Sequence, residues 1–406
     1  MTDLPKNFCY APFVHMYVHS NEGERVCCMS TEETMVSSTT ELDLSKRWTS
    51  EHLTSVRQDF LDNKRPSMCS KCFDLEDKGG HSDRHRFTNN YAQFNIVPNV
   101  ATGNQYNTPI DIDIRPGNLC NLGCRMCGPA SSTTIQKEIK KGIQDNSKID
   151  LIFGDGDVTE SNVLRVQENV EFLLQNVDKG RRIKFLGGEP TIMPEVDAFL
   201  DTLIERDLLD VPINFTTNCT NDNKRFIDKI SKFSEISFNY SVDGTGKTVE
   251  YIRHPVKFKS INKNIRVYHS LALYGEISYT LQAYNLFNLH EMLEWSSEIG
   301  VYTRPELLTM PEPLSCLSIP KKVRDKRIRL LIRMLDDIDK GELNRTHMKK
   351  KVIPVLERLY YDDRELSPVG IARHTKILDK SRNQHIKDYI PEVWDFIKEE
   401  YNAIQL

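Results

Sequence analysis

Short apolar segments alternate with longer amphipathic stretches along most of the chain after residue 108. The apolar segments have the length of β-strands. Between them, apolar residues recur every third or fourth position, as they do on one face of a helix. The predicted strands cover 110–115, 182–186, 211–216, 235–241, 277–283 and 301–307. Strands that alternate with helices in this way indicate an α/β fold, with a parallel sheet and right-handed crossovers.

Helices are predicted in each interval between these strands. The first begins at Ser131 or Ser132, either of which could cap it, and ends near residue 141. The others cover 163–175, 195–205, 225–232, 261–273 and 289–299. The stretch 146–178 is the one place where the regular alternation is interrupted.

The first 90 residues have a different pattern. Alternating apolar positions at 14, 16 and 18, a polar turn containing Gly23 and a return at 25–26 predict a β-hairpin over 11–28. A helix is predicted over 45–63. These elements would gather Cys9, the Cys27-Cys28 pair, Cys69 and Cys72 at one end of the hairpin. Thiols brought together in this way indicate joint metal ligation.

The chain after residue 320 is charged and predicted to be helical, with apolar residues at helical spacing in 324–337, 355–361 and 389–401. We find no chemical motif in it. The predicted organisation is a small N-terminal domain (1–90), a linker (91–108), an α/β domain (109–319) and a helical C-terminal extension (320–406).

Composition narrows the function classes. The 406 residues are 39% hydrophobic and 28% charged, which is typical of a globular protein. A net charge of −4 gives the protein no excess of positive charge, so nucleic-acid binding is not indicated. There is no apolar run of membrane-spanning length and no secretory signal pattern, so we expect a cytoplasmic protein without a membrane partner. In a reducing cytosol, the ten cysteines are more typical of metal binding than of disulfides.

Three cysteines, Cys120, Cys124 and Cys127, follow the first predicted strand at the spacing Cys-x3-Cys-x2-Cys. A loop this short can wrap three thiolates around one iron–sulfur cubane. The fourth iron then has no protein ligand, because no further cysteine lies nearby. A zinc site is the alternative, but it would need a second Cys-x2-Cys pair or added histidines.

The stretch IDIDIRPGNLCNLGCRMCGP, with apolar Met126 before the last cysteine, resembles the signature of radical S-adenosylmethionine (SAM) enzymes. The resemblance implies a partial (β/α)6 barrel and a [4Fe–4S] cluster whose open iron chelates SAM. It also implies reductive cleavage of SAM to a 5′-deoxyadenosyl radical. An electron donor such as flavodoxin or ferredoxin is implied as a partner.

Polar residues and glycines follow several predicted strands, where a parallel barrel carries its chemistry. Their segments resemble the SAM-binding segments of this family, among them a Gly-Gly-Glu motif and a Ser-x-Asp motif. The residues implied to bind SAM are Gly187, Gly188, Glu189, Asn218, Ser241, Asp243, Arg253 and Gln282, with Asn285 a further candidate. The alternatives are ordinary turns at the glycines and at Asp243, and a solvated arginine at position 253.

The N-terminal block resembles the twitch domain, a shortened relative of the SPASM domain that binds an auxiliary iron–sulfur cluster. The resemblance implies Cys9, Cys69, Cys72 and either Cys27 or Cys28 as ligands. Adjacent strand residues face opposite ways, so only one member of the pair can be a ligand, and we favour Cys27. A structural zinc ribbon remains the alternative, because zinc also takes four thiolates.

Cys219 and Cys316 belong to neither thiol set. Each is either a buried small hydrophobe or, by resemblance to radical epimerases, a hydrogen-atom donor to a substrate radical. The substrate implied by these features is a peptide or a small metabolite. Two other functions remain open: a catalytically silent iron–sulfur redox scaffold or sensor, and a zinc-ribbon interaction protein.

Overall fold

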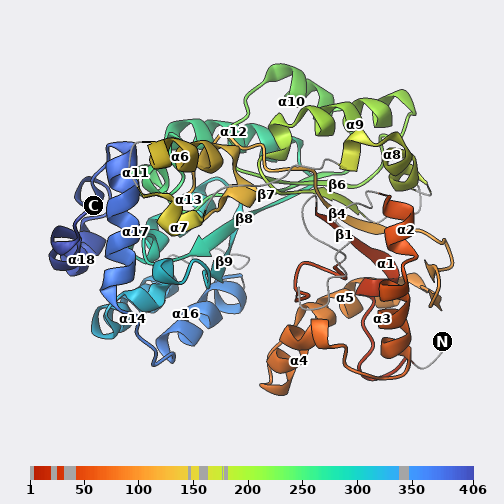
Figure 1. Ribbon diagram of the computed structural model, residues 1–406, viewed down its shortest axis with the longest axis horizontal. Helices are drawn as coiled ribbons and strands as arrows, with labels where there is room; N and C mark the ends of the chain where they lie inside the picture. The colour runs from red at the N-terminus through yellow and green to blue at the C-terminus, as the bar shows by residue number, and fades with distance from the viewer. Residues whose placement is uncertain are drawn as a thin grey trace. The chain divides into compact units, whose positions relative to one another are not determined.

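The computed structural model describes residues 4–19, 25–31, 43–144, 148–154, 163–175, 177, 182–337 and 347–406. Seven strands form one sheet in the order β1-β4-β5-β6-β7-β8-β9 (Figure 1). The pairs β1–β4, β4–β5, β5–β6, β7–β8 and β8–β9 are parallel. The strands are β1 (His15–His19), β4 (Asp111–Arg115), β5 (Arg182–Phe185), β6 (Ile213–Thr217), β7 (Ile236–Ser241), β8 (Tyr274–Leu281) and β9 (Tyr302–Leu307). The α/β fold with a parallel sheet is confirmed.

All six predicted strands are present as β4 to β9, with ends shifted by a few residues. The helices between them are α6 (Thr133–Gln144), α7 (Asp150–Phe153), α8 (Gln167–Leu174), α9 (Pro194–Glu205), α10 (Lys224–Ile230), α11 (Gly246–Ile252), α12 (Phe258–Leu271) and α13 (Leu289–Glu298). Helix α11 was not predicted. Ser132, not Ser131, caps α6, because its hydroxyl accepts the N–H of Ile135 at 3.2 Å.

The N-terminal helices are α1 (Ala11–Val14), α2 (Leu44–Trp48), α3 (Glu51–Leu61), α4 (Ser70–Asp77) and α5 (Asp83–Tyr91). A small antiparallel pair, β2 (Pro98–Asn99) with β3 (Gly103–Asn104), follows them. The C-terminal helices are α14 (Lys321–Asp337), α16 (Ile353–Tyr360), α17 (Pro368–Arg382) and α18 (Pro391–Ala403). Within the described part of the chain, no helix combines the length and apolarity needed to cross a membrane.

The chain folds as two compact units. The first consists of Met1–Gly117, Thr159–Phe215 and Asp228–Ile236. The second consists of Asn118–Val158, Thr216–Ile227 and Ser237–Leu406. The N-terminal cysteines and the Gly-Gly-Glu motif belong to the first unit, whereas the Cys120–Cys127 loop and the C-terminal helices belong to the second.

The predicted N-terminal hairpin is wrong in its main pairing. β1 joins the large sheet beside β4 in parallel, and the expected return strand is reduced to a single antiparallel bridge between Tyr17 and Arg25. The predicted turn at 20–24 lies outside the described residues. Alternation of apolar residues suits either pairing equally well, so the sequence pattern could not identify the partner strand.

The predicted helix over 45–63 is divided into α2 and α3. Ser50 separates them, because its side chain accepts the N–H of Leu53 and starts a new helix. The fully buried Arg57 of α3 holds this region together. Its guanidinium donates to the carbonyls of Pro12 and Trp48 at 2.8 Å and lies 4.5 Å from the centre of the Trp48 ring.

A polar network crosses β1, β4 and β5 in the first unit, where His15, Asp111 and Arg182 lie in register and Asp113 lies two residues further along β4. His15 contacts the Asp111 carboxylate at 3.2 Å, and Arg182 pairs with both Asp111 and Asp113 at about 3 Å. Burial opposes ionisation of Asp111, but the Arg182 guanidinium and His15 hold the pKa of that carboxyl below its ordinary value. The network ties the N-terminal strand to the sheet.

This network predicts a pH-dependent stability. Replacing Arg182 with Met leaves the buried Asp111 without its arginine, and should lower the free energy of unfolding by roughly 3 kcal/mol at pH 7. Because the folded-state pKa of Asp111 is depressed, its contribution is complete above the ordinary aspartate pKa and is lost as the pH falls. The deficit measured by urea unfolding should therefore stay constant from pH 7 down to the ordinary aspartate pKa of 3.8, and shrink as the pH falls below that value.

Arg206→Met is the matched control, because Arg206 pairs with Glu171 at the surface of the same unit. That pair should contribute about 1 kcal/mol or less. Equal losses from the two substitutions would contradict a special role for the network.

Candidate iron–sulfur sites

The loop that carries Cys120, Cys124 and Cys127 is fixed at both ends of its backbone. At one end, the hydroxyls of Thr133 and Thr134 donate to the Cys120 carbonyl, and Ser132 donates to the Leu122 carbonyl at 2.6 Å. The start of α6 therefore holds the first half of the loop. Cys124 is buried, whereas Cys120 and Cys127 are half-buried.

The second half of the loop pairs with the segment that follows α11. The Gly123 N–H donates to the His254 carbonyl at 2.7 Å, and the Arg125 N–H donates to the Ile252 carbonyl at 2.8 Å. These bonds flank Cys124. The loop is therefore held in place by protein contacts on both sides of its central cysteine.

Hydrogen-bond donors lie beside two of the three sulfurs. Arg253 Nη1 is 3.7 Å from Cys124 Sγ, and Asn218 Nδ2 is 3.9 Å from Cys120 Sγ. The Cys127 thiol donates to Cys124 and, together with Arg253, lowers the pKa of Cys124, although burial opposes this. A positive charge and amide donors stabilise thiolate sulfur, so the loop suits anionic ligands of an iron–sulfur cluster.

Asp243 and Arg253 form a buried ion pair next to this loop. Arg253 Nη2 lies 2.6 Å from Asp243 Oδ2, and the other carboxylate oxygen accepts the Thr280 N–H at 2.7 Å. Burial raises the pKa of Asp243, and Arg253 opposes that shift. Both carboxylate oxygens already accept protein donors, so the direct role of Asp243 here is to hold Arg253.

Gln282 and Asn285 lie in the same unit as this pair. The Asn285 side chain accepts the Gln282 N–H at 2.8 Å and donates to the Asp243 carbonyl at 3.2 Å. Gln282 is fully buried, and among the described residues its Oε1 has no hydrogen-bond partner. A buried, unpaired acceptor is costly, and it would be satisfied by a donor on a bound ligand. Ser241 is half-buried at the end of β7.

Asn218 and Cys219 follow β6 in the second unit. Cys219 adopts a left-handed backbone conformation with φ of 61°, which glycine takes more easily. Its N–H donates to Thr217 Oγ1 at 3.1 Å, and its side chain is fully buried. Cys316 is also buried, and burial raises the pKa of its thiol to about 12. Neither thiol is exposed, and the hydrogen-atom donor role stays a prediction.

The Gly-Gly-Glu motif follows β5 in the first unit. Gly187 has φ of 87°, and a Cβ there would lie 3.1 Å from the Gly117 carbonyl oxygen, so this turn requires glycine. Glu189 is fully buried and accepts from the backbone N–H and the hydroxyl of Thr191 at 3.2 and 2.6 Å. Its predicted contact with the amino group of SAM stays a prediction. Gly188 donates its N–H to the Gly117 carbonyl at 3.2 Å.

Four N-terminal thiols line one cavity in the first unit. Cys9, Cys27, Cys69 and Cys72 share its wall with apolar residues such as Phe60 and Phe87. Cys28 is exposed and does not line the cavity. The structure therefore brings together four of the five cysteines considered in this block, including the favoured member of the Cys27-Cys28 pair.

Donors also reach the sulfurs of this cavity. The Ala11 N–H donates to Cys9, the Met29 N–H donates to Cys27 and the Arg84 N–H donates to Cys72. Burial is the largest influence on all four thiols and raises the pKa of each. A bound metal would be needed to hold them as thiolates, and the donors would then stabilise the ligated sulfur.

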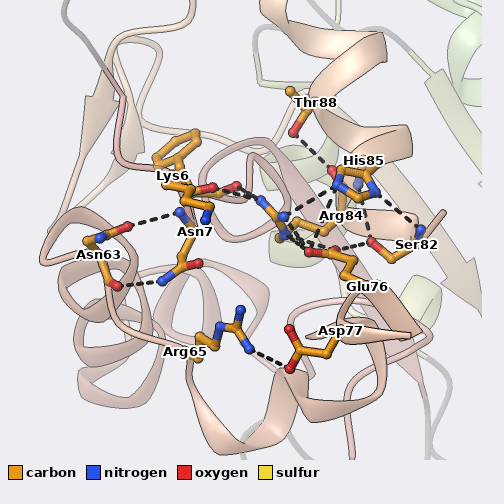
Figure 2. Close-up of polar contacts among 11 residues, drawn as sticks. Lys6, Asn7, Asn63, Arg65, Glu76, Asp77, Ser82, Arg84, His85 and Thr88 are labelled. Atoms are coloured by element: carbon orange, nitrogen blue, oxygen red, sulfur yellow. Dashed lines mark hydrogen bonds and ion pairs between the residues drawn. The ribbon is translucent and has the colours of Figure 1, made fainter. Parts of the chain in front are cut away.

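An ion-pair network centred on Arg84 borders the N-terminal cavity, which Arg84 itself lines (Figure 2). Arg84 of α5 contacts the Glu76 carboxylate of α4 and donates to the carbonyls of Lys6 and Phe8 at 3.2 and 3.0 Å. Ser82 also donates to Glu76. The network thus joins the segment before Cys9 to the helix that carries Cys72. Arg84 lies in the N-terminal block that resembles the twitch domain, but nothing in the sequence indicated this role.

The sequence of residues 114–281 matches the family model of the Radical SAM superfamily. This segment is a radical SAM domain. It contains the Cys120–Cys127 loop, the Gly-Gly-Glu motif, Asp243 and Arg253. The radical SAM domain supports the conclusion that the chain is an enzyme. No curated protein matches the chain.

Solved structures with bound SAM share a likeness with the chain. Native anSMEcpe with bound AdoMet is 16% identical, with a TM-score of 0.40, over 55% of this chain and 60% of that one. Streptococcus suis SuiB bound to S-adenosylmethionine is 13% identical, with a TM-score of 0.40, over 73% of this chain and 63% of that one. The match therefore spans about three fifths of the length of these proteins.

The contrast between Cys27 and Cys28 predicts different outcomes for two serine variants. Cys27→Ser should remove or distort the paramagnetic signal of the auxiliary cluster, because Cys27 lines the cavity with the other thiols. Cys28→Ser should leave the signal intact. Electron paramagnetic resonance (EPR) of the reduced, anaerobically reconstituted protein provides the measurement. The reverse result would make Cys28 the ligand, and one equivalent of zinc with no cluster in either variant would make the domain a structural ribbon.

Proposed function

We propose that the chain is a radical SAM enzyme that cleaves SAM reductively and abstracts hydrogen from a peptide or small-metabolite substrate. The observation that carries the proposal is the Cys120–Cys127 loop inside the radical SAM domain, with Arg253 and Asn218 donating toward its sulfurs. When bound, the cluster and SAM supply the 5′-deoxyadenosyl radical, which is chemistry that no side chain provides.

The chain's own residues bind and orient in this proposal. Cys120, Cys124 and Cys127 hold the cluster, and Arg253 places a positive charge beside Cys124 while Asp243 keeps it oriented. The unpaired Oε1 of Gln282 is available to accept a donor from SAM. Glu189 provides the carboxylate for the SAM ammonium group. Met126, Gly187, Gly188 and Ser241 complete the proposed cofactor site.

We further propose an auxiliary iron–sulfur cluster held by Cys9, Cys27, Cys69 and Cys72. The shared cavity and the donors that reach its sulfurs support joint ligation of one metal centre by these four thiolates. Ligation by four thiolates leaves no iron open to substrate and favours electron transfer. An external donor such as flavodoxin or ferredoxin would supply the electrons.

The decisive experiment is the detection of 5′-deoxyadenosine. Reconstituted wild-type protein, given SAM and a strong reductant, should release 5′-deoxyadenosine and methionine in equal amounts. The triple variant Cys120→Ala, Cys124→Ala, Cys127→Ala should release neither, and should keep only the iron of the auxiliary site. Wild-type protein with a full complement of iron and no product would favour a catalytically silent scaffold. Full iron and unchanged cleavage in the triple variant would contradict the ligand assignment.

The role of Glu189 predicts a loss of SAM affinity. Glu189→Gln keeps the shape of the side chain but removes its charge, so binding should weaken by about 1.5–3 kcal/mol in isothermal titration calorimetry. Glu195→Gln is the matched control, because Glu195 lies in the same unit and pairs with Arg165. Unchanged affinity in Glu189→Gln would remove this residue from the site.

A further inference from the structure

A charged side chain is buried in the middle of the cysteine loop. Arg125 stands between Cys124 and Cys127 and has no exposed surface. Its Nε donates to the Tyr251 carbonyl at 3.0 Å, and the guanidinium lies 3.5 Å from the centre of the Tyr251 ring. A buried guanidinium also needs a countercharge, since desolvating it alone is costly.

The countercharge comes from α17, far along the chain. Arg125 Nη2 donates to Asp379 Oδ1 at 2.7 Å and to Gln384 Oε1 at 3.0 Å. Asp379 is itself buried and accepts from the Tyr251 hydroxyl at 2.7 Å and from the Ile386 N–H at 2.9 Å. A carboxylate bound this completely has one orientation, and it therefore fixes the position of Arg125.

Two more residues of α17 reach the backbone of the loop. His374 Nε2 lies 2.9 Å from the Arg125 carbonyl, and burial lowers the pKa of His374 to about 3, so the ring is neutral and donates from Nε2. Arg382 pairs with Glu138 of α6 directly against Gly123. A Cβ at Gly123 would lie 2.9 Å from Arg382 Nη2, so the Arg382 side chain lies close against the cysteine loop.

We propose that α17 is part of the metal centre, as a clamp that holds the cysteine loop in its ligand geometry. Arg125 and Asp379 are its positioning residues. A loop with three metal ligands in eight residues must keep all its thiolates converging. The buried ion pair between Arg125 and Asp379 ties this loop to a rigid helix and so restricts its motion. The inference rests on the proposed function in assuming that this loop holds a cluster. It assigns a role to a C-terminal segment in which the sequence indicated no chemistry.

The test measures how firmly the cluster is held, independently of turnover. The full-length protein is reconstituted anaerobically, and the rate of iron release to a ferrous chelator is followed together with the EPR spectrum. The signal that changes when SAM is added belongs to the cluster with an open iron, which separates it from the auxiliary cluster. The variants are Asp379→Asn, which removes the countercharge, and Arg125→Lys, which removes the planar fork.

Arg324→Lys is the matched control. Arg324 of α14 is equally buried in the same unit and donates to the carbonyls of Asp362 and Arg364 at 2.6 and 3.1 Å, and neither of these residues belongs to the cysteine loop or to α17. Asp379→Asn and Arg125→Lys should release iron from the SAM-responsive cluster at least tenfold faster and broaden its signal. Arg324→Lys should release iron at the wild-type rate even where its melting temperature falls as much.

The outcomes separate this inference from the proposed function. Wild-type release rates in folded Asp379→Asn, or equal acceleration in Arg324→Lys, would overturn the clamp while leaving the cluster in place. A wild-type protein without a SAM-responsive cluster would overturn the proposed function itself. If the charge variants do not fold, His374→Leu and His374→Gln replace them. Gln can still donate to the Arg125 carbonyl, so it should restore slow release, and failure to do so would also overturn the clamp.

Discussion

The burial of arginine guanidinium groups is the constraint on which most of this structure depends. A guanidinium keeps its charge when it is buried, so it must find carboxylates, carbonyls or aromatic faces, and these partners then lose their freedom. Arg125 does this for the cysteine loop and Arg57 for the first N-terminal helices, while the half-buried Arg84 joins the segments around the N-terminal thiols in a similar way. In each case at least one partner is distant in sequence, so the arginine helps to determine which segments lie together.

Both thiol sets follow the same physical arrangement. In each, donors from neighbouring backbone or side chains point toward sulfur. Such donors stabilise negative charge on sulfur, and charged or helical supports hold them in position. The two sets differ in their sources of support: a long-range ion pair to α17 holds the Cys120–Cys127 loop, whereas the N-terminal set is supported mainly by α4 and α5.

The elements that depend on local pattern could be predicted from the sequence, and those that depend on partners could not. Strands β4 to β9 follow from apolar runs and their flanking turns. The β1 strand was also visible, but its neighbour was not, since alternation at 14, 16 and 18 suits a hairpin and a parallel partner equally. Gly187 and the spacing of Cys120 to Cys127 could be recognised from the sequence, because a tight turn and a short ligand loop each need particular residues at particular positions. Asp379 could not be recognised, because its role depends entirely on its contacts in the folded protein.

The pairing of β1 with β4 has a consequence for how the chain can be divided. The five residues of β1 cover the hydrogen-bonding edge of β4, with His15 opposite Asp111 and His19 opposite Arg115. A chain cut after residue 90 would leave that edge bare, and an uncovered edge strand readily pairs with strands of other molecules. The N-terminal segment therefore also covers an edge of the sheet. Expressing the two parts separately should favour aggregation rather than yield two independently folded domains.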